Sequence, residues 1–487
     1  MLKSYHSLNY DLQFNRRESD SSLKILQEPF NQYSLLDISI LPSILLNFLT
    51  FFCFQYMIYF NPALGLLEGL GMTETQLNWV WIAYYATMTI TCFPLTIGVL
   101  FISRNIKLHL VCVNLLSTGL LLVQVFSTNV NYFGVIVCML GLLQGLQIPL
   151  NLLYLTKIYP KHALEIRLAF IFGISILLSL GFVPLITMGL SRREYDNHYL
   201  KGYRINYLIL FFIQLLALLF NQFQLPQNVY QLKKLTHINL KKLTQQLKSD
   251  FISLNFNFPL SLRQIFSEFV KFPTYALFVL VFCSEWLIKL TFYWHWYFMP
   301  QSGIMGYTTT GPSIGVGFVF FIISLIATAI GRKWNARLTV ILLTFIASFV
   351  FFHLVAFIPQ SSSKIHLGLN IIQFSLNWTL KALLINFITI NSLGNHQTIM
   401  NLSLLSISFY LVNMLSLFDW FPANYTRINT YYPAYLMIFI ISMFLVLGLR
   451  LLFGRRNGQT STREQDPFSS YKYKWDQIDT LGFRYLI

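Results

Sequence analysis

The chain has 487 residues, of which 55% are hydrophobic, 17% aromatic and only 11% charged. Soluble domains carry about a quarter charged residues, so this composition excludes a soluble protein together with collagenous, disordered and disulfide-scaffold classes. It indicates a protein embedded in a membrane. About twelve helices of ~20 residues fit this length with their loops and tails, without a large soluble domain.

The first forty residues show no apolar segment followed by a small-residue cleavage site, so the sequence predicts no secretory signal peptide. The cysteines are odd in number, lie in apolar runs and form no C-x-x-C pair, so they predict neither a metal site nor a disulfide framework. We expect no metal, no cofactor and a packing role for these five residues: Cys53, Cys92, Cys112, Cys138 and Cys283.

Apolar runs of about 20 residues predict twelve membrane spans. The longest connection separates the sixth span from the seventh, so we expect an all-α integral membrane protein with two six-helix halves. The predicted parts are an N-terminal tail 1–39, a first half 40–221, a basic linker 222–273, a second half 274–454 and a C-terminal tail 455–487. The spans are expected at 40–60, 79–101, 108–127, 133–155, 168–190, 206–221, 274–297, 313–331, 338–358, 366–390, 398–418 and 432–453.

The net charge of +16 reports the topology of the chain. An even number of spans places both termini on one side, and most basic residues flank the spans on that side. By the positive-inside rule this side is cytoplasmic, which predicts a multi-pass protein of the cell (inner or plasma) membrane touching anionic lipid, and no nucleic-acid partner. The opposite side carries Arg192, Arg193, Lys201, Arg204, Lys364 and Arg427.

Within the linker, apolar residues alternate with lysines over 232–248, which is typical of an amphipathic helix on the membrane surface. A solvated flexible linker fits the same composition. The stretch 261–264 has the S-x-x-Q pattern of a capping box and predicts a short helix before the seventh span.

Three charged residues stand out inside the predicted spans, away from the span ends. Glu285 lies near the middle of the seventh span with Lys289 four residues later, and Lys381 lies close to the middle of the tenth. A charge at the bilayer centre costs at least ~2.5 kcal/mol, so these side chains are expected to face protein or a water-filled cavity. His295 lies near the outer end of the seventh span and is expected to be an interfacial anchor.

Amide side chains recur at helical spacing in spans one, four and ten. In span ten, the residues Asn370, Gln373, Asn377 and Lys381 fall within an arc of about 80°. Together with the charges of span seven, this recurrence at every third span predicts a polar cavity between the two halves. The alternative is that the amides only bond neighbouring helices. The other two stripes contain Gln144, Gln147, Asn151 and Tyr154 in span four, and Asn47, Phe51, Gln55 and Tyr59 in span one.

The stretch after span two, Gly98 to Lys107, resembles the G-x-L-a-D-R-x-G-R-K loop of the major facilitator superfamily. Gly98, Leu100, Arg104 and Lys107 match, whereas the acidic position is Ile102 and the second glycine is Asn105. The resemblance covers about 40–455. It implies two six-helix halves around a central cavity that is lined by the first and fourth helix of each half, and a gate loop containing Gly98, Arg104 and Lys107.

Two further stretches resemble the same superfamily. Its fourth-helix pattern R-x-x-q-G is matched by Gln144 and Gly145, with Gly141 in place of the arginine that relatives use in proton coupling. The second-half loop 331–337 keeps basic residues but no acid. The nearest resemblance is to drug:proton antiporters, because their fifth-helix glycine–proline pattern is similar to Gly173, Gly181, Pro184 and Gly189.

These patterns predict a secondary transporter that moves a small solute by alternating access, is proton-coupled and favours efflux. Glu285 is the expected coupling site, and a permanent structural pair with Lys289 or Lys381 is the alternative. Two lysines against one glutamate favour an anionic or zwitterionic solute, and Trp378 with the span-seven aromatics suits a flat or amphipathic one.

Two other classes of protein were weighed. A polytopic membrane transferase acting on a lipid-linked substrate generally needs acids or histidines on a substantial interfacial loop, and the outer loop 298–312 has no titratable residue. A passive channel would be favoured by a ring of like charges, which the sequence does not show.

Overall fold

The computed structural model describes residues 29–102, 105–191, 201–227, 271–301, 310–357, 363–392, 394–417 and 428–463, with the single residues 243, 263 and 267. Its helices are α2 (Pro29–Phe60), η1 (Asn61–Leu64), α3 (Leu66–Leu70), α4 (Glu74–Ile102), α5 (Ile106–Val125), α6 (Val130–Gln144), α7 (Gln147–Ile158), α8 (Lys161–Ser191), α9 (Gly202–Gln224), α12 (Phe272–Gln301), α13 (Thr310–Lys333), α14 (Arg337–Phe357), α15 (Ser363–Asn391), α16 (Gly394–Leu415) and α17 (Ile428–Arg463).

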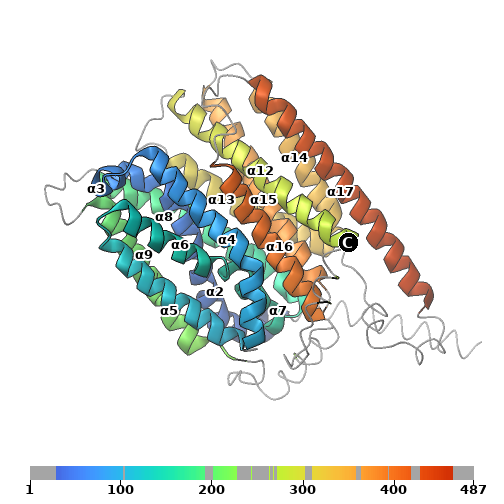
Figure 1. Ribbon diagram of the computed structural model, residues 1–487. Helices are drawn as coiled ribbons and strands as arrows, with labels where there is room; N and C mark the ends of the chain where they lie inside the picture. The colour runs from blue at the N-terminus through green and yellow to red at the C-terminus, as the bar shows by residue number, and fades with distance from the viewer. Residues whose placement is uncertain are drawn as a thin grey trace, which may run out of the picture.

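Twelve helical segments in the described part are long and apolar enough to cross a bilayer, so the predicted all-α fold with twelve spans is confirmed. Helix α2 begins before the boundary predicted at 39, and α17 continues beyond the one predicted at 454. Most of the predicted linker and the predicted capping box lie outside the described residues. Figure 1 shows the helices of the first half, blue to green, beside those of the second half, yellow to red.

The two halves meet mainly along two helix pairs, α8 with α13 and α4 with α16. In the first pair the backbones approach closely at Gly317, where an added Cβ would lie 2.9 Å from the Cα of Leu177. Small residues at such crossings allow membrane helices to pack. Inside each half the closest pairs include α2 with α8 and α12 with α15.

Polar side chains cap several helices at their first turn. Thr73 and Gln76 exchange side-chain and backbone hydrogen bonds of 3.0 and 3.3 Å and form a capping box before α4. Asn105 accepts a bond from the backbone N–H of Leu108 at the start of α5. Asn105 occupies the place of the second glycine in the superfamily loop. The residue that departs from the superfamily pattern is therefore the one that caps the start of α5.

Predicted span four consists of two helices, α6 and α7, that are separated at Gly145 and Leu146. Pro149 lies in the first turn of α7 and cannot donate a backbone bond to the carbonyl of Gly145. That carbonyl instead faces the hydroxyl of Tyr410 in α16, at 3.4 Å. The break therefore gives the second half a polar contact to the backbone of the first.

Successive spans cross in opposite directions, so α2 begins and α17 ends at the same end of the bundle. We call this the termini end. The loops after α4, α7 and α13 also lie at the termini end. Helices α2 and α12 finish at the other side of the bundle, which we call the opposite end.

Candidate functional site

An ion pair lies near mid-depth in the second half of the bundle. The Nζ atom of Lys381 in α15 is 2.7 Å from Oε1 of Glu285 in α12, and both side chains are almost completely buried, with 5% and 1% exposed. The lysine also lies 3.5 Å from the ring centre of Phe409 and 4.8 Å from that of Trp378. The sequence predicted these two charges to share one site, and the structure brings them together.

A cavity lies against this pair and between the two halves. Glu285 and Lys289 of α12 form its charged wall. It extends from mid-depth towards the opposite end. The remaining lining residues are mostly aromatic and come from α2, α4, α12, α15 and α16: Phe52, Gln55, Tyr56, Tyr85, Ile288, Phe374, Trp378, Phe409 and Asn413.

A buried chain of hydrogen bonds links the cavity to the break between α6 and α7. Gln55 accepts a bond from the hydroxyl of Tyr85 and donates to that of Tyr84 at 2.7 Å, and Tyr84 donates to Gln144. Gln55 therefore lines the cavity, whereas Gln144 reaches it through Tyr84. The tyrosines were not predicted as site residues, because aromatic side chains are common throughout the spans.

The other amides predicted in the first half lie in a separate buried network. Asn47 donates to Asn151 at 2.8 Å and accepts from Asn114 of α5 and Asn221 of α9 at 3.0 and 2.9 Å. Gln147 and Gln214 donate to Asn114 at 3.3 and 2.7 Å. The network joins spans one, three, four and six, and none of its members is among the residues lining the cavity.

The second half contains a corresponding network around Asn377. Its amide donates to Thr291 of α12 at 3.1 Å and accepts a bond from Ser348 of α14, which also bonds Tyr435 of α17 at 2.8 Å. Spans seven, nine, ten and twelve are thus joined like their counterparts in the first half. Asn370 and Gln373 are buried on α15, away from the cavity lining.

The predicted gate loop is described only in part. Gly98 lies within α4 and Lys107 in the first turn of α5, while Arg104 lies outside the described residues. At Gly141, the position of the superfamily arginine, an added Cβ would lie 2.7 Å from the carbonyl oxygen of Tyr84. An arginine side chain would not fit at this position, because α6 packs against the backbone of α4 there.

An ion pair between the halves lies at the termini end. Arg337 begins α14, and its Nε is 2.5 Å from Oε1 of Glu165 in α8, with both side chains at least nine-tenths buried. The same guanidinium donates to Asn335, whose left-handed backbone turns the loop between α13 and α14. That loop has no acid of its own, and the structure supplies one from span five.

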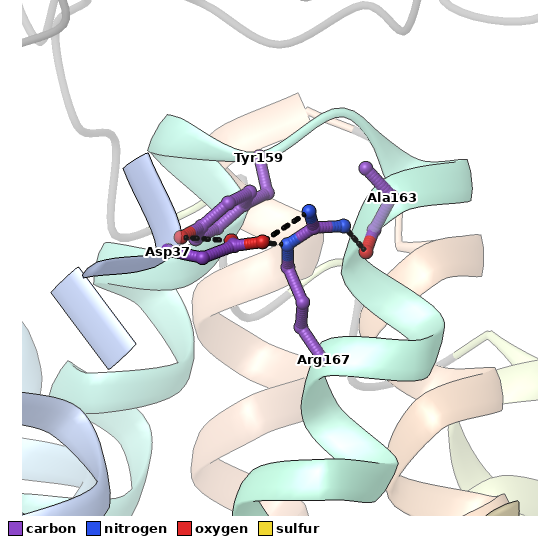
Figure 2. A network of polar contacts seen from close by, with 4 residues as sticks. All are labelled: Asp37, Tyr159, Ala163 and Arg167. Atoms are coloured by element: carbon purple, nitrogen blue, oxygen red, sulfur yellow. Dashed lines mark hydrogen bonds and ion pairs between the residues drawn. The ribbon is translucent and has the colours of Figure 1, made fainter. Parts of the chain in front are cut away.

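A second ion pair joins α2 to α8 at the termini end. Figure 2 shows Arg167 pairing with both carboxylate oxygens of Asp37, at 2.6 and 2.7 Å, and donating to the carbonyl of Ala163. Tyr159 donates to the same carboxylate at 3.0 Å. Burial raises the pKa of Tyr159, so its phenol keeps the proton that makes this bond. The pair holds the start of α8, and with it Glu165, against α2.

The described cysteines and acids form no metal centre. Within those residues no group of three or more His, Cys, Asp or Glu side chains is placed to hold a metal ion. Cys53, Cys92 and Cys283 are buried in the packing, whereas Cys112 is exposed on α5.

Comparisons with known proteins agree with this architecture. The sequence matches the Major Facilitator Superfamily over residues 43–400. No curated protein sequence matches it. Among solved structures, the fold is similar to the structure of the major facilitator superfamily proton:xylose symporter XylE bound to 6-bromo-6-deoxy-D-glucose. The TM-score is 0.59 at 13% identity, covering 84% of this chain and 94% of that chain. At this identity the likeness shows the fold alone.

Proposed function

Because this chain belongs to the major facilitator superfamily, a family of transporters, we propose that it moves a small solute across its membrane by alternating access, coupled to protons at Glu285. Family membership makes the chain a transporter and not an enzyme, so the transferase alternative is set aside. The substrate, the coupling and the direction of transport are the parts that we propose.

The observation that carries this proposal is the Glu285–Lys381 pair beside a cavity between the two halves. A buried ion pair gains little stability over apolar packing, because desolvation offsets its attraction. Charges inside a membrane protein therefore favour a functional role. Glu285 is a wall residue of the cavity, so water, protons and solute can reach it when the cavity opens.

The coupling follows from charge balance. With Glu285 ionised, Lys381 is compensated. Protonation of Glu285 would leave the buried lysine without its counter-charge, and a solute bearing negative charge would restore the balance. Proton binding and solute binding thus change each other's free energy, which is what coupling requires.

The closed parts of the interface support alternating access. Glu165 and Arg337 join the halves at the termini end, while the cavity extends towards the opposite end. We propose that the termini end faces the cytoplasm of a cell that carries the protein in its plasma or inner membrane. The basic loops would then contact anionic lipid. Opening towards the cytoplasm requires this ion pair to separate.

Two directions of transport have support. Gly173 and Gly181 of α8 face α13. These glycines belong to the span-five pattern that resembles drug:proton antiporters, which favours proton exchange and efflux. Co-transport of a proton with an anionic or amphipathic solute is the second candidate, favoured by Lys381, which loses its counter-charge when Glu285 takes up a proton.

The test uses purified protein in liposomes that contain a pH-reporting dye. Anionic, zwitterionic, neutral and cationic solutes are added outside, and the internal pH is followed. We expect the entry of one solute class to be accompanied by proton movement. Protons would move inward with the solute in co-transport and outward, against the solute, in exchange. Solute movement without proton movement would contradict the coupling. If no solute of the four classes moved, the proposal that this cavity carries a solute across the membrane would be contradicted.

A further inference from the structure

A second pocket lies at the termini end, beside the ion pair that joins the two halves. Glu165 of α8 forms its wall on the side of the first half, and the other lining residues belong to α13, α14 and α15. None of the described residues lines both this pocket and the cavity at Glu285. The charged residues among those described that line it are Glu165 and Arg337, which pair with each other at 2.5 Å. Because these two charges compensate each other, the pocket suits a neutral ligand.

One polar side chain in this pocket has an unused hydrogen-bonding position. Asn386 of α15 is only 5% exposed, and its side-chain oxygen Oδ1 has no hydrogen-bond partner within the described part of the chain. Its Nδ2 donates a long bond of 3.5 Å to the hydroxyl of Thr328 on α13. A buried amide oxygen without a donor is costly, so such a group usually meets a ligand or water. Since Asn386 lines the pocket, a ligand bound there can satisfy it.

Asn386 and Thr328 together define the chemical group that fits. The Asn386 oxygen needs a donor, and the Thr328 hydroxyl beside it accepts one bond and can donate another. A hydroxyl group both donates and accepts at the same atom, so it complements both residues and fits either orientation of the amide. An ether or ketone can only accept, and an ammonium group can only donate.

The remainder of the pocket wall is apolar. Val340, Ile341 and Leu383 are aliphatic, Phe387 supplies a single ring, and all four side chains are buried. Contact with such a wall removes the apolar part of a ligand from water. The wall therefore favours a small hydrocarbon body attached to the hydroxyl group.

We propose that this pocket binds a small neutral alcohol, whose hydroxyl group bonds Asn386 and Thr328 while its apolar body packs against α14 and α15, and that the bound alcohol keeps the termini end closed. Glu165 forms a wall of the pocket in the conformation in which it pairs with Arg337, so separation of the halves removes that wall. A ligand that binds one conformation more tightly shifts the equilibrium towards it. Inhibition of transport by the alcohol rests on the proposed function, whereas its binding does not.

The test is photolabelling of the purified full-length protein in nanodiscs with a diazirine analogue of butanol, followed by mass spectrometry of the labelled peptides. We expect saturable adducts on the pocket-lining segments of α13, α14 and α15. Excess cyclohexanol should abolish them. Methylcyclohexane, which lacks the hydroxyl group, and cyclohexylamine, which is charged, should leave them in place. Absence of adducts on these segments, or equal competition by all three compounds, would overturn the proposal.

Variants assign the contacts. Asn386→Leu keeps the size of the side chain and removes the amide, so the adduct yield should fall about fivefold, the factor that one hydrogen bond is worth. Asn401→Leu is the matched control, because Asn401 is also buried with an unpartnered oxygen within the described residues but does not line the pocket. Ala327→Leu keeps the amide and fills the pocket, so it should abolish labelling. Wild-type yields in either Asn386→Leu or Ala327→Leu protein would refute the site.

The labelling needs no solute and no gradient, so the two proposals can fail separately. In liposomes, cyclohexanol should slow solute movement by the wild type several-fold and have a smaller effect on Asn386→Leu protein. Labelling of the pocket without solute movement in any assay would contradict transport and leave the site standing. Proton-coupled solute movement without labelling would contradict the site and leave the transporter proposal standing. Labelling together with unslowed transport would contradict the closing role of the alcohol.

Discussion

The ammonium group of Lys381 lies 2.7 Å from the carboxylate of Glu285, with both groups buried near the middle of the bundle and one of them in a cavity wall. The pair joins α12 to α15, the two helices that carry charged residues near the middle of a span. Its position places in the cavity wall a carboxylate whose counter-charge is a neighbouring lysine.

Lys381→Met should destabilise the protein because it leaves the Glu285 carboxylate buried without its counter-charge. We expect a loss of roughly 3–5 kcal/mol if the carboxylate stays charged, and less if it takes up a proton. The double variant Glu285→Gln/Lys381→Met should recover most of the loss. Thermal unfolding of purified protein measures both, and strictly additive losses would show that the two groups do not interact.

Glu165→Gln should weaken closure at the termini end, because it leaves Arg337 without its carboxylate. Breaking a buried pair costs roughly 3–5 kcal/mol, enough to shift a conformational equilibrium by more than a hundredfold. Spin labels at Leu108→Cys and Trp334→Cys, two exposed positions at this end, report the change as a longer inter-label distance.

The charge reversal Glu165→Arg/Arg337→Glu is the control for this ion pair. It keeps a pair of opposite charges and should restore the short inter-label distance. If the distance distributions of the wild type, Glu165→Gln and the reversed pair are the same, the ion pair does not control closure.

Gly141→Ala should destabilise the first half, because the added methyl group meets the carbonyl oxygen of Tyr84. Overpacking of this kind costs about 1–3 kcal/mol. Gly119→Ala is the matched control, since it is also helical and nothing lies within 4 Å of its added Cβ. Equal unfolding temperatures for the two variants would contradict the close packing of α6 on α4.

Asn114→Ala removes the shared partner of Asn47, Gln147 and Gln214 and should lower stability by about 1–2 kcal/mol. Solute affinity should stay unchanged because the network is separate from the cavity. Asn131→Ala, on an exposed face of α6, is the control. Unchanged stability with lost affinity would favour the original expectation that these amides contact solute.

The spans were predictable because a bilayer demands long apolar runs, and this signal is strong in every one of the twelve. Helix ends were less predictable. Helix α2 begins at Pro29 and α17 ends at Arg463. Both boundaries lie beyond the apolar runs, where hydropathy gives no signal.

The polar stripes are visible in the sequence, but the neighbouring helices that they face were not predictable. Asn47 and Gln55 lie on the same helix eight residues apart; one joins the amide network and the other lines the cavity. Periodicity places residues on one face of a helix without saying which neighbour that face meets. The sequence did contain a hint of the amide network, because Asn114 and Gln214 are isolated amide residues in spans three and six.

The role of Glu165 was missed for a similar reason. In the sequence it is an acid just before predicted span five, far from Arg337, and neither the motif of its own loop nor its spacing indicates the partner. Only the packing of α8 against the second half brings the two together.

The most direct test of the account is proton-coupled transport by Glu285→Gln protein in liposomes, with Glu74→Gln, exposed at the start of α4, as the control. The variant keeps the shape of the side chain and cannot exchange a proton. We predict that proton-driven accumulation is lost while solute still equilibrates down its own gradient. Wild-type accumulation by Glu285→Gln would contradict the assignment of Glu285 as the coupling site.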